Sequence, residues 1–231
     1  MLGVLVNTLT VLIGGTVGLL CKKGIPKRLT DAVMIGLGLC TFYIGIDGAL
    51  EGENTLVLIA AMVLGAIVGT LLDIDGAINR LGGWVENRFR GGEENTVAQG
   101  FVTASLLFCV GSMTVVGSLE AGISGDNTML FTKSTLDLCS SAMLAASLGI
   151  GVLCSAVFVL AFQGGLVLLS GLLAPMLGNP SLLAEMTCAG SLLIVGIGLN
   201  LIGVTKLKVA NYLPAILFAP ILAALADRLP L

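Results

Sequence analysis

The sequence contains no histidine and few charges, because Asp, Glu, Lys and Arg together make up only 11% of its 231 residues. Histidine is the commonest general base and metal ligand in proteins, so its absence argues against most acid–base sites and metal centres. A soluble domain carries about 25% charged residues, so this chain has too little polar surface for a water-soluble globule. Its scattered Lys and Arg also exclude the dense basic face that nucleic acid requires.

The cysteines are equally uninformative about cofactors, because all six stand singly in or beside apolar runs, without a CxxC pair. Isolated cysteines of this kind behave as small buried hydrophobes. Neither a disulfide framework nor a zinc site is indicated. We therefore expect no metal and no cofactor. The six are Cys21, Cys40, Cys109, Cys139, Cys154 and Cys188.

Long apolar runs dominate what is present. Hydrophobic residues make up 56% of the chain, 32 glycines come on top, and the mean hydropathy is +1.06. A membrane-spanning helix needs about 20 mostly apolar residues. The sequence therefore predicts an all-α, polytopic transmembrane helix bundle of about eight spans, forming one integral membrane domain over residues 1–231. The expected spans are residues 2–21, 32–50, 55–72, 97–119, 128–150, 151–177, 183–204 and 210–226.

Two features of this arrangement concern topology. Residues 128–165 fit either one broken span or two separate spans, because almost no polar linker divides them. If the loop after the first span is cytoplasmic, all Lys and Arg residues except Lys133 and Arg228 face the cytoplasm, as the positive-inside rule requires. Both termini are then predicted to be extracytoplasmic.

The second and seventh spans share a glycine pattern. Gly38-x6-Gly45 lies in one and Gly196-x6-Gly203 in the other, and the polar segments before them also match loosely. Spans one to three would then repeat as spans six to eight with opposite orientation, an arrangement common in secondary transporters. Because Gly and Leu are abundant here, chance similarity stays open.

Glycine and proline inside the spans have two readings. Small residues let helix backbones approach closely, which favours helix packing. Locally unwound helix that exposes carbonyl groups to an ion is the alternative. The positions concerned include Gly38, Gly45, Gly111, Gly196, Gly198, Gly203 and Pro214.

The segment with the clearest chemical content begins the fifth span. Lys133 and Asp137 are four residues apart, so they share a helix face and can pair. Such residues below the interface suggest a cation or proton pathway, which Ser134 would also line. An interfacial pair whose Lys133 reaches out to water is the alternative.

Isolated amides and hydroxyls inside other spans are weaker candidates. Asn200, central in the seventh span, either bonds helices together or lines the same path, and Asn7 and Thr114 belong to the same class. Asp47 and Glu185 stand at span ends and are expected at the interface. No pairing of a nucleophile with a base stands out, so we do not expect an enzyme.

Several strings together resemble a known family. They are Lys22–Arg28 (KKGIPKR), Gly38–Gly45 (GLCTFYIG), Gly100–Met113 (GFVTASLLFCVGSM), Thr132-Lys-Ser134 with Asp137, Leu148–Val152 (LGIGV), and Gly196–Asn200 (GIGLN) followed by Lys208–Ala215 (KVANYLPA). The chain resembles the YqgA-like bacterial inner-membrane proteins, a family classed as a domain of unknown function. The resemblance implies a multi-span helical fold in the bacterial cytoplasmic membrane, and it implies no substrate.

A secondary transporter of a small ion or small solute agrees best with these observations. A non-transporting membrane component, such as a sensor, assembly partner or structural protein, and a channel are the alternatives. The expected partner is the lipid bilayer, and the packing glycines are compatible with a homodimer.

Overall fold

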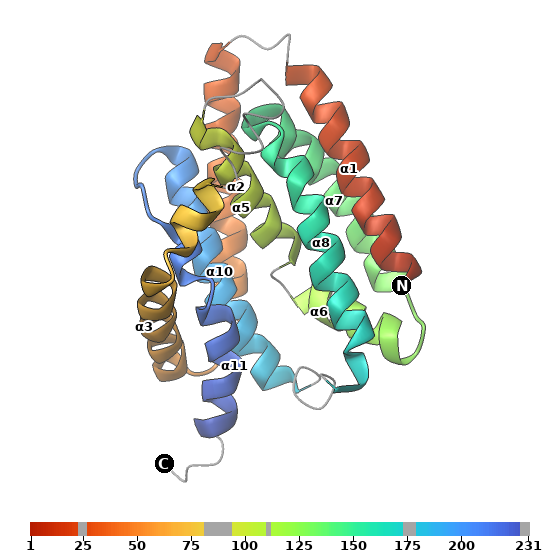
Figure 1. Ribbon diagram of the computed structural model, residues 1–231, viewed down its shortest axis with the longest axis vertical. Helices are drawn as coiled ribbons and strands as arrows, with labels where there is room; N and C mark the ends of the chain where they lie inside the picture. Colours follow the sequence, from red (N-terminus) through yellow and green to blue (C-terminus); the bar gives the residue numbers. More distant parts are fainter. Residues whose placement is uncertain (23–26, 81–93, 110–111, 173–178, 227–231) are drawn as a thin grey trace. The chain divides into compact units, whose positions relative to one another are not determined.

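A computed structural model describes residues 1–22, 27–80, 94–109, 112–172 and 179–226, which contain helices and no strand (Figure 1). The longer helices in chain order are α1 (Leu2–Lys22), α2 (Lys27–Ala49), α3 (Thr55–Leu71), α5 (Glu94–Cys109), α6 (Ser112–Ile123), α7 (Thr128–Leu148), α8 (Gly151–Leu168), α10 (Pro180–Ile202) and α11 (Ala215–Ala226), with the 3₁₀-helix η1 (Val209–Tyr212) before α11. A short helix, Ile74–Arg80, follows α3.

These helices form two compact units. Unit 1 comprises Met1–Met34, Ile78–Cys109 and Met113–Leu173, and it contains α1 and α5 to α8. Unit 2 comprises Ile35–Ala77, Val110–Ser112 and Ala174–Leu231, and it contains most of α2 together with α3, α10 and α11. Neither unit is continuous in sequence, since the chain passes from unit 1 to unit 2 within α2.

Large apolar side chains cover the outer faces of the helices. On α1 and α3 they recur every three or four residues, which aligns them along one side of each helix. A stripe of this kind suits contact with lipid tails. The exposed residues are Leu2, Leu5, Leu9, Ile13, Val17 and Leu20 on α1, and Leu56, Ile59, Val63, Ile67 and Leu71 on α3.

In unit 1, α1 packs along α7 in the same direction. Gly3 of α1 contacts Leu130 near the start of α7, and Gly18 contacts Ala142 nearer its end. A side chain on Gly14 or Gly18 would collide with a backbone carbonyl of α7. Glycine is therefore needed for this close approach, as small residues are at membrane helix interfaces.

The α7–α8 junction is a reversal of the chain at Gly149, whose φ of 82° ends α7 in a conformation that glycine adopts readily. Gly15 of α1 lies against Leu153, early in α8, and Asn7, early in α1, donates a hydrogen bond to Gln163 near the end of α8. Since α8 thus runs against α1 and α7 runs with it, residues 128–165 form two antiparallel helices. The alternative of one broken span does not hold.

The predicted single span at 97–119 is instead broken into α5 and α6, which differ in direction by 59°. The start of α5 approaches the α7–α8 turn so closely that a side chain on Gly151 would collide with the Val97 carbonyl. The rings of Phe101 and Phe158 meet edge to face at 6.1 Å, so α5 runs beside α8 in the same direction. The hydropathy of this stretch gave no sign of the break.

In unit 2, α2 and α10 cross in opposite directions through the glycines of the suspected repeat. A side chain on Gly38 would lie 3.1 Å from the Gly198 carbonyl oxygen, and one on Gly198 would lie 2.7 Å from the Phe42 nitrogen. Gly45 makes a similar approach to Val195. These three glycines therefore serve helix packing.

The other helix pair of unit 2, α3 and α11, is also antiparallel. Val57 at the start of α3 packs with Ala223 late in α11, whereas Gly69 near the end of α3 lies against Asn211 of η1. The Asn211 side-chain oxygen accepts a hydrogen bond of 2.8 Å from the Asp75 backbone N–H. This bond ties the end of α3 to the start of the last helical segment.

Among the described residues, four helices are long and apolar enough to span a membrane, or six spans if each of two bent pairs counts as one. The all-α membrane bundle predicted from the sequence is confirmed. Within each unit, the helix directions are those that eight alternating spans would have. The span number itself stays a prediction, because α7 does not meet the same test and α2 contributes only the shorter apolar helix Met34–Ala49 to it.

Candidate ion or solute site in unit 1

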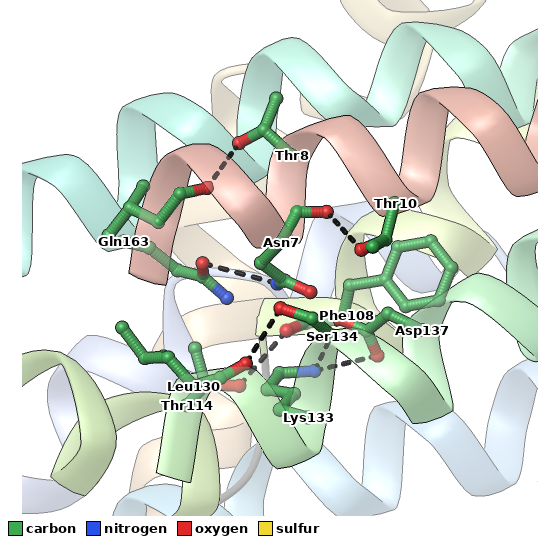
Figure 2. A network of polar contacts seen from close by, with 11 residues as sticks. Asn7, Thr8, Thr10, Phe108, Thr114, Leu130, Lys133, Ser134, Asp137 and Gln163 are labelled. Atoms are coloured by element: carbon green, nitrogen blue, oxygen red, sulfur yellow. Dashed lines mark hydrogen bonds and ion pairs between the residues drawn. The ribbon is translucent and has the colours of Figure 1, made fainter. Parts of the chain in front are cut away.

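A buried ion pair lies inside unit 1. The Lys133 ammonium nitrogen is 2.8 and 2.7 Å from the two carboxylate oxygens of Asp137, so it contacts both (Figure 2). Their side chains are only 8% and 7% exposed. Asp137 is the tenth residue of α7, about 14 Å along the helix. The pair is therefore enclosed within unit 1, and the Lys133 side chain does not extend to the surface of the unit.

Neutral polar groups from α1 and α8 face this pair. The Asn7 side-chain amide donates to the Gln163 side-chain oxygen at 3.2 Å, and both residues are fully buried. The Asn7 amide also lies close enough to the Asp137 carboxylate to interact with it. Figure 2 shows Asn7 between Gln163 and α7. Asn7 thus connects the α1–α8 contact to the charged pair.

Two polar atoms of this cluster lack a hydrogen-bond partner. The Asn7 side-chain oxygen and the Gln163 side-chain nitrogen are buried and have no hydrogen-bond partner among the described residues. A buried polar group without a partner costs about 1–3 kcal/mol. A bound water or a small polar solute could form hydrogen bonds with both this acceptor and this donor.

The break between α5 and α6 lies next to the same pair. The Phe108 ring centroid is 5.9 Å from the Lys133 ammonium nitrogen, within cation–π range. The Thr114 hydroxyl donates to the Phe108 carbonyl at 3.0 Å across the break. The structure thus brings Thr114 and Asn7 to the Lys133–Asp137 pair, as Figure 2 shows.

Ser134 contributes less than its position in the sequence suggested. Its hydroxyl donates to the Leu130 carbonyl of its own helix at 2.7 Å, a common way for serine to satisfy itself within a helix. It is buried beside Lys133, but its proton is already engaged. Gln163, by contrast, was not singled out from the sequence, although an amide deep in an apolar run was a usable signal.

Asn200 has a local role in unit 2. Its side-chain oxygen accepts hydrogen bonds from the Thr205 hydroxyl at 2.7 Å and the Leu207 backbone N–H at 2.8 Å, and its amide donates to the Leu207 carbonyl. These bonds close the turn between α10 and η1. Gly203, with a φ of 86°, ends α10 in the same turn. The structure places Asn200 and the Lys133–Asp137 pair in different units.

Two further predicted positions lie at a helix contact and at a helix start. Gly196 faces Val209 of η1, and Pro214 directly precedes α11, where its carbonyl accepts the first hydrogen bonds of that helix. Gly111 lies outside the described residues. Among the residues that the structure covers, no cluster of three His, Cys, Asp or Glu side chains could hold a metal ion.

Unit 2 has a buried carboxylate of its own, which the sequence had suggested was interfacial. Glu185 of α10 is 1% exposed. One of its oxygens accepts from the backbone N–H groups of Glu53 and Asn54 at 2.8 and 2.6 Å. Its other oxygen has no partner among the described residues. The carboxylate therefore holds the turn before α3 through backbone donors.

Together, the apolar outer stripes, the polar interior and the helix lengths define a polytopic helical membrane protein. A family model described as "Protein of unknown function (DUF554)" matches residues 2–224. The chain belongs to this family, which confirms its resemblance to the YqgA-like proteins.

Two relatives match over nearly their whole length. The "Uncharacterized membrane protein YdfK" of Bacillus subtilis (strain 168) is 30% identical over 225 residues, covering 96% of this chain and 95% of the relative. The "Uncharacterized protein YqgA" of Escherichia coli (strain K12) is 30% identical over 227 residues, covering 96% of each. No solved structure matches the chain. The relatives support a membrane location.

Proposed function

We propose that this protein is a secondary transporter of a small ion or small solute, and that its pathway passes the Lys133–Asp137 pair. The observation that carries the proposal is a bidentate ion pair buried among neutral polar groups of α1 and α8, beside the break between α5 and α6. Ionisable residues inside a membrane domain are costly and mark ion or substrate pathways. Broken helices line such pathways in many transporters.

A stability role for the pair is the weaker explanation. Taking two charges out of water costs several kcal/mol per ion, and replacing a buried pair with apolar residues is often neutral or stabilising. The unpartnered donor of Gln163 and acceptor of Asn7 add a further cost. Retaining all four groups in one place is more easily explained by a ligand.

The helix contacts also favour the inverted repeat. The repeat would make α1 equivalent to α8, α2 to α10 and α3 to α11, and each of these three pairs packs antiparallel within one unit. A two-fold axis that relates the two helices of each pair would produce such antiparallel packing. Inverted repeats let a carrier open alternately to either side.

The cellular setting is part of the same proposal. We place the chain in the bacterial cytoplasmic membrane with both termini extracytoplasmic, because the positive-inside rule assigns most Lys and Arg to the opposite face. The chain acts on its ligand by binding and moving it, without covalent chemistry. A non-transporting component is the second candidate, favoured by the local, structural role of Asn200.

The proposal is tested by ligand-dependent stability. A ligand that binds only the folded state raises stability by about RT ln(1 + [L]/Kd). We would melt the purified full chain in detergent against inorganic ions, amino acids, organic acids and nucleobases. We expect a saturable rise with one class of solute, followed by uptake of that solute into proteoliposomes.

Two variants make this test specific. Lys133→Met/Asp137→Leu removes both charges and should abolish the rise while preserving the fold. Thr16→Val changes an exposed hydroxyl of α1 that bonds its own helix, and it should respond like the parent. If no solute raises stability and none is taken up, the non-transporting alternative is favoured.

A further inference from the structure

The Asp137 carboxylate occupies a position that another carboxylate could take. The Lys133 ammonium contacts both of its oxygens at nearly equal distance, 2.8 and 2.7 Å. An ammonium placed symmetrically across two oxygens recognises the carboxylate group itself, whichever molecule carries it. Asp137 therefore shows where the head group of a carboxylate ligand would lie.

Charge balance restricts how such a ligand could enter. Lys133 and Asp137 together are neutral, and the groups around them, Asn7, Gln163 and Thr114, carry no charge. A charge left buried without a partner is strongly destabilising. An anion can thus join Lys133 without a net charge in the site only if Asp137 gives up its own.

We propose that a small organic carboxylate replaces Asp137 at Lys133 when Asp137 takes up a proton, so that one proton accompanies each anion. This inference rests on the proposed transporter function and names its substrate class. The Lys133–Asp137 ion pair breaks, an O–H bond forms on Asp137 with a proton from water, and Lys133 pairs with the incoming carboxylate. The site carries one positive and one negative charge before and after the exchange.

The side chains of Asn7 and Gln163 can accommodate both the Lys133–Asp137 ion pair and the form in which a carboxylate ligand has replaced Asp137. The unpartnered Gln163 amide nitrogen can donate to the displaced carboxyl or the ligand, and the unpartnered Asn7 oxygen can accept the new Asp137 proton. Both atoms lie in the cluster that Figure 2 shows. The exchange therefore satisfies two polar atoms that have no partner in the ion-paired state.

Few other titratable groups could carry this proton. On the helices around the pair, the titratable residues besides Lys133 and Asp137 are Cys21 and Lys22 of α1, Glu94 and Cys109 of α5, Glu120 of α6, Cys139 of α7 and Cys154 of α8, together with the amino group of Met1 before α1. Of these, Cys109 interacts electrostatically with both members of the pair. A thiol is neutral at ordinary pH, so Asp137 is the proton carrier.

The test uses the purified full chain in detergent with sodium pyruvate as the probe. We would measure the Kd from the rise in Tm at about pH 5.5 and about pH 8. Binding linked to one proton weakens by up to about tenfold per pH unit where Asp137 is ionised. We expect pyruvate to bind at least about tenfold more tightly at the lower pH. Methyl pyruvate and sodium chloride are the uncharged and inorganic controls, and neither should act.

Two variants separate the exchange from a general charge effect. Asp137→Asn leaves Lys133 without its internal carboxylate, so pyruvate should bind tightly at both pH values and restore the Tm that this substitution lowers. Lys133→Met/Asp137→Leu should fold and show no response to pyruvate. Asp137→Asn tests whether the pH dependence of binding comes from Asp137. The double variant tests whether the Lys133 ammonium binds the carboxylate.

The outcomes distinguish failure of the carboxylate exchange from failure of the transporter proposal. A different class of solute that stabilises the parent and loses its effect in the double variant would leave the transporter in place and overturn the carboxylate exchange. Equal pyruvate binding at both pH values in the parent would overturn the coupling to a proton. No response to any solute, with no uptake, would overturn both proposals.

Discussion

Among the described residues, each of the two units buries one carboxylate, and the two units stabilise it in different ways. In unit 1, Asp137 faces the Lys133 ammonium across 2.7 Å. In unit 2, one oxygen of Glu185 accepts two backbone N–H groups from the turn before α3, and the described residues supply it with no cation. Backbone donors are fixed in place, whereas a lysine side chain can move and change partners. Asp137 is thus suited to exchange and Glu185 to holding a turn.

The largest change in stability is expected when one charge of the Lys133–Asp137 pair is removed. Lys133→Met leaves the Asp137 carboxylate buried without a cation, which should lower the free energy of unfolding by about 3–5 kcal/mol. The double variant Lys133→Met/Asp137→Leu should recover to within about 1 kcal/mol of the parent or exceed it. Denaturant unfolding in detergent measures both. A single variant as stable as the parent would mean that water already reaches Asp137.

Removing the charge of Glu185, by contrast, should change the free energy of unfolding only slightly. Glu185→Gln keeps an oxygen for the Glu53 and Asn54 N–H groups, so it should change the free energy of unfolding by less than about 1 kcal/mol. Glu185→Ala leaves both N–H groups without this acceptor and should cost about 2–3 kcal/mol. The same unfolding experiment decides between them. A Glu185→Gln cost as large as that of Glu185→Ala would show that the charge itself is needed, as for Asp137.

A third prediction concerns how closely the helices of unit 2 approach. A side chain on Gly45 would lie 2.6 Å from the Val195 nitrogen, so Gly45→Ala should cost about 1–3 kcal/mol by overpacking. Gly36, on the same helix, has open space where a side chain would lie. Gly36→Ala should therefore stabilise the chain by about 0.5–1 kcal/mol, as alanine does in a helix. Equal effects at both sites would contradict the packing described for α2 and α10.

The smallest expected effects are those of pH on two loop carboxylates. The backbone and side-chain hydrogen bonds from Thr128 lower the pKa of Asp126 in the loop before α7. This group favours folding above its unfolded pKa of about 4, and that contribution is lost as the pH falls through its lower folded pKa. Asp126→Asn should thus show a weaker loss of Tm than the parent below about pH 4.

Glu51, in the turn that Glu185 holds, should respond in the other direction. Partial burial, and then the nearby charge of Asp47, raise the pKa of Glu51. Its ionisation opposes folding, so stability falls as the pH rises from its unfolded pKa of about 4 through its folded pKa. Glu51→Gln should consequently raise Tm near neutral pH and not below about pH 4. The reverse pattern would show that the pKa of Glu51 is not raised in the folded chain.

The sequence was sufficient for features that depend on composition or on spacing within one helix. Apolar runs predicted a helical membrane protein, and a spacing of four residues predicted that Lys133 and Asp137 could pair. What spacing cannot supply is contact between distant segments. Gln163 meets Asn7 across 156 positions, and Glu185 meets the turn at Glu53 across 132. Only the packing of antiparallel helices brings such groups together.

Residues that close turns were also hard to recognise. Asn200 looked like an isolated amide inside a span, yet its partners Thr205 and Leu207 lie five and seven residues ahead, in the segment that follows α10. The left-handed conformation of Gly203 is a matching stop signal, but glycine is too common in this chain for that signal to stand out. Whether Asn200 also lines a pathway stays a prediction.

The reversal at Gly149 has a consequence for biosynthesis. During insertion by the translocon, a lysine and an aspartate near the middle of a helix each cost about 2.5–3.5 kcal/mol, so α7 alone would partition poorly into lipid. The turn joins it directly to α8, whose described residues include no charged side chain. We expect the two helices to enter the membrane together as a hairpin. The ribosome must then complete α8 before the charged segment leaves the aqueous channel.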